Sequence, residues 1–228
     1  MVVKISQNQL KFFFQLIQCD KEFGGMIKTN RNGYIEDISK TLGGNYSVKY
    51  TNIDSSYNYS YHTHAYYSFL HGILNGKNVI DIIAKLIKVD MNAGLYLFEC
   101  DIMYIHPPSP QDCYVCSHSN KRGMLIFTQE GIYEVRTSKI LTLMDKDEID
   151  NEYYRYIWGD SKHNVESCLQ SNSIPRIIKR LRRCMSYRKR VNKLHCVSQY
   201  IRYLKTKGVS CKLVKWDTNK HVFFSRNN

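Results

Sequence analysis

The sequence lacks an apolar run that could cross a membrane, and it lacks the pattern of a secretory signal. The N-terminal run LKFFFQLI (10–17) is short, is broken by Lys and Gln, and is not followed by a small-residue cleavage site. A membrane-spanning helix needs roughly 20 apolar residues, and no later stretch approaches that length. Internal repeats and low-complexity tracts are absent as well. We therefore expect a protein without a transmembrane segment, in a reducing compartment such as the cytoplasm or the nucleus.

A second closely spaced cysteine pair is also lacking. Among the eight cysteines, Cys113 and Cys116 form a lone C-x-x-C pair, with His118 nearby. A structural zinc site of the finger type needs a second pair of ligands at a matching spacing. We interpret these cysteines as free thiols.

Acidic residues are scarce in the last third of the chain. Residues 161–228 contain 17 of the 33 Lys and Arg but only two of the 20 Asp and Glu, so this stretch carries +15 and residues 1–160 carry −2. A concentrated positive face favours nucleic acid, an acidic protein or an anionic membrane as partner.

The basic charge is densest at 176–190, where eight of fifteen residues are Lys or Arg. Ile177, Ile178, Leu181 and Met185 recur there at helical spacing, which predicts a helix with one packed face. The side chains expected to contact a nucleic acid or an acidic partner are Arg180, Arg182, Arg183, Arg188, Lys189 and Arg190, and Tyr187, Tyr200 and Tyr203 are available to stack on bases.

The rest of the composition indicates a folded domain, because 43% of the residues are hydrophobic and 13% are aromatic. The pattern mixes strands with helices, which predicts an α/β (α+β) fold in a single domain. We expect helices at 6–19, 76–90, from Ser109 onward, 174–188 and 190–207. We expect strands at 22–30, 31–42, 45–64 and 93–108, a hairpin at 121–138, an acidic loop at 145–152 and a strand pair at 209–226.

Two histidines stand one residue apart in the strand-like stretch YSYHTHAYYSF (59–69). Residues i and i+2 of a strand point to the same side, so His62 and His64 can direct two imidazoles at one metal ion. In a Tyr-rich strand such a pair is more often a polar face than a ligand pair. A catalytic zinc needs one more protein ligand and a general base.

Carboxylates that could complete such a site lie on either side of the pair. In PPSPQD, Asp112 stands one turn into an expected helix with Ser109 at its N-cap, so the two share a face. Upstream, EFGG puts Glu22 on the first strand, where glycines permit close backbone approach. Each of these residues also has an ordinary structural role, as a cap, a dipole partner or a strand-edge acid. Their order along the chain is E…H-x-H…S-x-x-D.

This order resembles the JAMM motif of the JAB/MPN metalloprotease family, whose members cleave isopeptide bonds, most often of ubiquitin or ubiquitin-like modifiers. The resemblance covers roughly residues 6–138: a helix, EFGGMI as the strand with the acid, H-x-H at a strand end, and PSPQD opening a helix. The hairpin GMLIFTQEGIYEVR resembles that of JAB-like proteins of large DNA viruses.

The resemblance implies a role for each matching residue. His62, His64 and Asp112 would hold one zinc ion, Glu22 would act as the general base, and Ser109 would hydrogen-bond the oxyanion on the scissile carbonyl. It also implies a mixed central sheet flanked by helices. The core would be residues 1–140 with an insertion at about 66–105, and residues 141–228 would be a basic extension packed on it.

Two departures from the motif leave a second alignment open. The family usually has proline after the second histidine and a short loop before S-x-x-D, whereas here Ala65 follows and more than forty residues precede Ser109. In the second alignment, within MYIHPPSPQD, His106 takes the place of the second histidine and Tyr104 that of the first, so zinc would be lost. We favour the first alignment, because it preserves the histidine pair.

Three functions follow from these patterns. The first is zinc-dependent hydrolysis of a conjugate of a ubiquitin-like modifier or another protein substrate. The second is a JAB-fold scaffold without catalysis, located in the particle of a large DNA virus and bound to capsid or other assembly proteins. The third is nucleic-acid binding through the basic extension.

Overall fold

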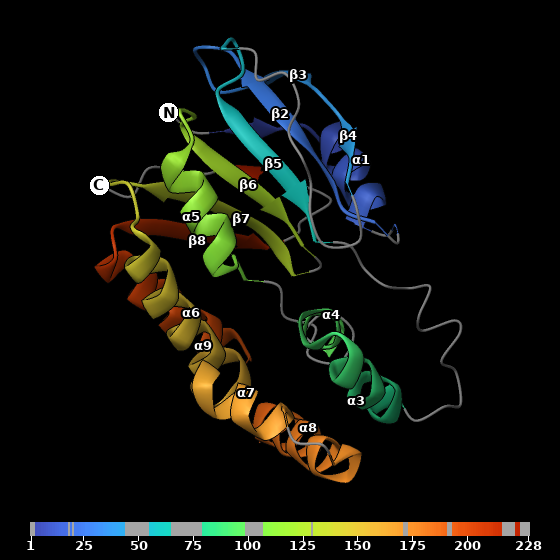
Figure 1. The fold of residues 1–228 in the computed structure, drawn as a ribbon. Coiled ribbons are helices and arrows are strands. Elements are labelled where there is room, and N and C mark those ends of the chain that lie inside the picture. The colour runs from blue at the N-terminus through green and yellow to red at the C-terminus, as the bar shows by residue number, and fades with distance from the viewer. Residues whose placement is uncertain are drawn as a thin grey trace.

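The computed structural model describes residues 3–17, 19, 21–43, 55–64, 79–98, 107–128, 130–170, 173–190, 193–215 and 222–223. They form a mixed α/β structure in which one sheet lies between helices (Figure 1). The strands are β1 (Lys4–Ile5), β2 (Phe23–Thr29), β3 (Ile35–Ile38), β4 (Thr41–Leu42), β5 (Tyr59–Thr63), β6 (Gly123–Phe127), β7 (Gly131–Thr137), β8 (Val209–Lys215) and β9 (Val222–Phe223). The helices are α1 (Gln7–Ile17), α3 (Val79–Val89), α4 (Met91–Leu97), α5 (Pro110–His118), α6 (Leu143–Trp158), α7 (Lys162–Leu169), α8 (Ile174–Arg190) and α9 (Lys193–Thr206).

The main sheet has the strand order β3-β2-β5-β6-β7-β8, and the short β4 also pairs with β2. The β5–β6 pair is parallel, and the other pairs are antiparallel. A separate two-stranded sheet joins β1 to β9. The strand β5 therefore lies inside the sheet, with hydrogen-bonded neighbours on both sides.

Side chains alternate between the two faces of the sheet, as the pleat requires. Tyr61, Leu125 and Phe127 point to one face and pack against α1, where the rings of Phe13 and Phe127 stack at 3.8 Å. Met124 and Ile126 point to the other face, toward α5 and the helices that follow it. The sequence alternation of β5 and β6 thus decides which residues reach the α5 side.

The second face continues into a large core that joins three parts of the chain. It contains residues of α3 and α4, of the sheet, and of α6 to α9. Phe98, just after α4, stacks on Trp158 of α6 with ring centroids 4.7 Å apart. The helices α6 to α9 form a column beside the sheet, and α3 lies along α8 (Figure 1).

Several expected elements are confirmed. The structure has α1, the β2–β3 strands with their turn at Gly33 (φ 86°), α3, the helix that begins after Ser109, the β6–β7 hairpin, and α8 followed by α9. Of the long strand expected at 45–64, Tyr59–Thr63 is a strand, and 44–54 lie outside the described residues.

The strand expected at 93–108 is wrong for its first part. Met91–Leu97 form the helix α4, which starts at Asp90, whose carboxylate accepts a hydrogen bond from the N–H of Ala93. Residues 99–106 lie outside the described residues. A short and mostly apolar run carries no clear period, so the N-cap was the informative signal.

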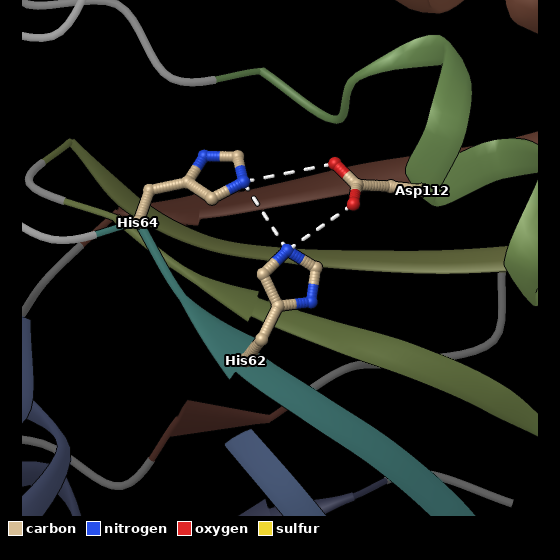
Figure 2. A group of neighbouring side chains, drawn as sticks. All are labelled: His62, His64 and Asp112. Atoms are coloured by element: carbon tan, nitrogen blue, oxygen red, sulfur yellow. Dashed lines mark hydrogen bonds and ion pairs between the residues drawn. The ribbon is translucent and has the colours of Figure 1, made fainter. Parts of the chain in front are cut away.

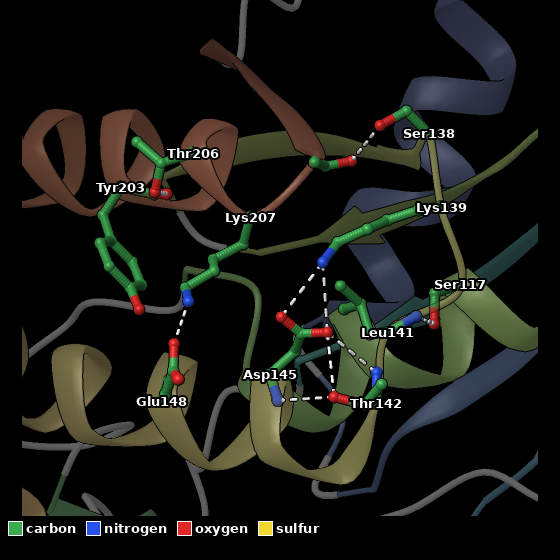
Figure 3. Close-up of polar contacts among 11 residues, drawn as sticks. Ser117, Ser138, Lys139, Leu141, Thr142, Asp145, Glu148, Tyr203, Thr206 and Lys207 are labelled. Atoms are coloured by element: carbon green, nitrogen blue, oxygen red, sulfur yellow. Dashed lines mark hydrogen bonds and ion pairs between the residues drawn. The ribbon is translucent and has the colours of Figure 1, made fainter.

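The acidic loop expected at 145–152 is wrong as well, because these residues belong to α6. Thr142 and Asp145 form a reciprocal capping box at its N-terminus. Figure 3 shows this box together with the ion pairs Lys139–Asp145 and Lys207–Glu148. The acidic residues therefore belong to a helix, and Glu148 links it to Lys207, the residue that follows α9.

The two last strands do not pair with each other. The first, β8, pairs with β7 along seven residues, and β9 pairs with β1 at the start of the chain. Both pairings are distant in sequence, so turn chemistry near the strands gives no sign of them. In the described ranges no helix has the length and apolarity needed to cross a bilayer.

Candidate metal centre

The strand β5 positions the two histidines. His62 lies opposite Ile126 of β6 and opposite Gly24 of β2, and its side chain points to the α5 face. His64 follows the end of the strand, and its backbone N–H donates to the carbonyl of Phe127 at 2.9 Å. Both histidines are buried: His62 is 7% exposed to solvent and His64 is 9% exposed. Burial on a strand held from both sides limits the motion of the pair.

The first turn of α5 brings the third group. Ser109 is the N-cap, and its Oγ accepts a hydrogen bond from the N–H of Asp112 at 3.1 Å. The N–H of Ser109 in turn donates to Oδ2 of Asp112 at 2.7 Å. Pro110 at the first helical position favours this start because it needs no hydrogen-bond acceptor there. The capping box therefore fixes the carboxylate of Asp112 in one orientation.

The three side chains converge on one point, as Figure 2 shows. The Nε2 atoms of His62 and His64 are 3.2 Å apart. Oδ1 of Asp112 lies 3.3 Å from Nε2 of His62, and Oδ2 lies 3.6 Å from Nε2 of His64. Ligand atoms on a tetrahedral zinc, each about 2.0–2.1 Å from the ion, are separated by about 3.3–3.4 Å. The donor set and its spacing therefore fit zinc.

The charges of the triad support each other. Burial raises the pKa of Asp112, but the charges of His62 and His64 and their hydrogen bonds outweigh it and hold that pKa well below its usual range. Burial lowers the pKa of His64, yet the hydrogen bond and charge of Asp112, with the charges of Glu22 and Glu130, raise it overall. The site thus places the buried carboxylate of Asp112 against two imidazoles, and the charges of Glu22 and Glu130 also act on His64.

The predicted general base lies beside this triad. Gly24 of β2 pairs with His62, and Glu22 stands two residues before Gly24, directly before the strand begins. The N–H of Phe23 donates to Oγ1 of Thr63 at 2.9 Å, which holds the strands together at this point. Glu22 is 5% exposed, and its charge acts on the pKa of His64. The structure therefore brings all five motif residues to one end of β5.

A second carboxylate near the site was not predicted. Glu130 lies at the turn between β6 and β7, where one carboxylate oxygen accepts a hydrogen bond from the hydroxyl of Tyr133 at 3.0 Å. Its charge also contributes to the raised pKa of His64. Its sequence position signals only a turn before Gly131, so no local pattern marks it as a site residue.

A groove of about 570 Å³ lies between α5 and the face of the sheet that carries His62. Ser60 contributes to it from β5, two residues before His62, and Met26 contributes from β2. The opposite wall is α5, with Gln111 next to Asp112, then Tyr114 and His118 one and two turns on. The rings of Tyr114 and His118 lie 4.3 Å apart. The groove therefore lies along α5, and the described residues that line it include none of the three triad residues.

The basic residues that were predicted to bind a partner lie in different environments on α8. Arg182 and Arg183 are exposed on α8, whereas Arg180 is buried and forms an ion pair with Asp160. Arg188, Lys189 and Arg190 lie in the last turn of α8, but their side chains are outside the described residues. Tyr104 and His106 of the second alignment are also outside them.

The C-x-x-C pair takes part in the core. Cys113 and Cys116 are buried on the sheet side of α5, and burial raises the pKa of Cys116 to about 12. Among the described residues, His62, His64 and Asp112 are the one group of three His, Cys, Asp or Glu whose ligand atoms lie within 4.8 Å of one another.

Comparisons of this chain with protein-family models, with curated proteins and with solved structures find no match.

Proposed function

We propose that this protein is a zinc-dependent hydrolase of the JAMM type that cleaves an amide bond in a protein conjugate. The observation that carries the proposal is the buried group of His62, His64 and Asp112, with ligand atoms at zinc spacing and Glu22 at its side. Two histidines and a carboxylate are also a common iron site. A buried glutamate next to the ligands is the feature that favours hydrolysis, because hydrolysis needs a general base.

Zinc, when bound, polarises a carbonyl and lowers the pKa of a coordinated water from about 16 toward 7. The chain supplies the remaining steps. Glu22 takes a proton from the attacking water and returns it to the leaving amine. The hydroxyl hydrogen of Ser109 donates to the oxygen of the scissile carbonyl as negative charge develops there. The groove beside the centre holds the substrate chain against Ser60 and α5.

The substrate class follows from the shape of this groove together with the resemblance to the JAMM motif. A groove of about 570 Å³ along α5 accommodates several residues of an extended chain, which suits the tail of a protein modifier. The isopeptide bond of a ubiquitin-like conjugate is therefore the first substrate to test.

The first experiment measures metal content by mass spectrometry in protein purified without added zinc. We expect about one zinc per wild-type chain, as a His₂Asp site holds a single ion. The His62→Ala/His64→Ala variant should lose it, while His163→Ala, an exposed histidine of α7, should keep it. Iron in place of zinc, or no metal in any folded variant, would contradict the proposal.

A second arm uses Glu22→Gln, which keeps the shape of the side chain and removes the base. We expect zinc to remain while cleavage of isopeptide-linked ubiquitin chains falls by about 10²–10⁴-fold or more, the usual contribution of a general base. Bound zinc without any cleavage by the wild-type protein would instead favour a structural metal in a JAB-fold scaffold.

A further inference from the structure

A cationic pocket separate from the metal centre lies between α7 and α8. Its volume is about 370 Å³, which is within the range of small-molecule sites. The residues that line it are Ser167, Cys168, Arg176, Lys179, Arg180 and Arg183. Four of these six side chains carry a positive charge, and the other two are small and polar.

The four cations form one stripe of α8 because of their spacing. They stand at i, i+3, i+4 and i+7, so each lies above the previous one on the same face of the helix. Ile177 and Leu181 occupy a different face and are fully buried in the core. Arg182 is exposed on the helix but does not line the pocket. The pocket is therefore one defined part of the basic extension.

Arg180 is the buried member of the stripe, with 9% of the residue exposed. One Nη atom forms an ion pair with Asp160, and its buried Nε has no hydrogen-bond partner among the described residues. The neighbouring Lys162 pairs with Asp150 and lies near Glu166. Among the ion pairs of the described residues, Asp160 is thus the one acid that pairs with any of the four cations. The Nε donor of Arg180 still lacks an acceptor there.

We propose that this pocket binds a small molecule that carries two or more phosphate groups. Several arginines in a confined space provide planar forks of donors that match phosphate oxygens, and a multiply charged anion relieves the repulsion among the four cations. Among the residues whose side chains the structure describes, no aromatic ring lines the pocket, so these residues offer no platform on which a base could stack. The described lining is therefore suited to phosphate groups.

The experiment measures binding of inorganic tripolyphosphate by calorimetry to the full-length chain. We expect binding to weaken by roughly tenfold or more in Arg183→Gln, because one charge-assisted contact is lost. Arg182→Gln removes the same charge from the same helix outside the pocket and should change the affinity by less than about threefold. Tripolyphosphate should also slow alkylation of Cys168, which is exposed and lines the pocket.

Two results would overturn the proposal. One is equal weakening by Arg182→Gln and Arg183→Gln, which indicates diffuse attraction to a basic surface. The other is tighter binding of an oligothymidylate of about 20 nucleotides than of tripolyphosphate, with a steep salt dependence, which indicates a nucleic-acid surface. Failure of zinc binding would leave this result untouched, because the pocket shares no residue with the metal centre.

Discussion

At the scale of single residues, Ser109 caps α5, and the proposed function gives it a second role as the donor to the substrate oxygen. Its Oγ caps α5 by accepting from the N–H of Asp112, while its hydroxyl hydrogen remains available for a substrate oxygen. We expect Ser109→Ala to lower the free energy of unfolding by about 1 kcal/mol through loss of the cap. We also expect kcat to fall by about 10²–10³-fold through loss of the oxyanion donor.

The matched control for this substitution is Thr142→Ala. Thr142 caps α6 with the same capping box but belongs to another helix. Thr142→Ala should lower the free energy of unfolding, measured by urea titration, by about as much as Ser109→Ala does. It should leave kcat unchanged. Equal kcat in the two variants would mean that Ser109 is only a cap.

The site residues differ in how far their sequence positions reveal them. His62 and His64 could be predicted because a strand directs i and i+2 to one side, and Asp112 because S-P-x-D starts a helix in a known orientation. Glu22 could be placed only through the family order, since nothing local indicates that β2 pairs beside β5. Glu130 could not be predicted, because its charge comes to act on His64 only through the tertiary packing of a turn.

At the scale of elements, β2 depends on a glycine that permits close backbone contact. A Cβ on Gly25 would lie 2.1 Å from the carbonyl oxygen of Ser39, which also accepts a hydrogen bond from the hydroxyl of Tyr61. We therefore expect Gly25→Ala to displace this segment and to lower the free energy of unfolding by about 3 kcal/mol. Lys28→Ala, at a half-buried position of the same strand, should cost far less in the same urea titration.

Helices with a single clear apolar face were predicted from the sequence. Of the helices without one, α5 was predicted from its N-cap, whereas α4 and α6 were not predicted. The helices α1, α3 and α8 each have a strong apolar stripe. By contrast, α4 is short and apolar, and α6 has acids spread along its exposed side. In both helices the residue that reveals the start is the N-cap, Asp90 or Thr142, so caps are more informative here than hydrophobicity.

At the scale of the whole molecule, the basic extension helps to hold the segment in the middle of the chain that carries Ser109 and Asp112. The hydroxyl of Tyr200 in α9 donates to the carbonyl of Pro108 at 3.0 Å, directly before Ser109. Tyr200 is fully buried, and burial raises its pKa well above the usual range, so the hydroxyl stays protonated as a donor. The segment that starts α5 is therefore held by a residue more than ninety positions away.

Tyr200→Phe tests this long-range support by removing one oxygen atom. A buried carbonyl that loses its donor costs about 1–3 kcal/mol, so we expect a loss of stability in that range. Because the same carbonyl belongs to the start of α5, zinc should also dissociate faster, as measured by competition with a chromogenic chelator. Tyr34→Phe makes the same chemical change at a half-exposed ring and should alter neither value. Reduced stability with unchanged zinc release would show that α9 supports the core but does not position Asp112.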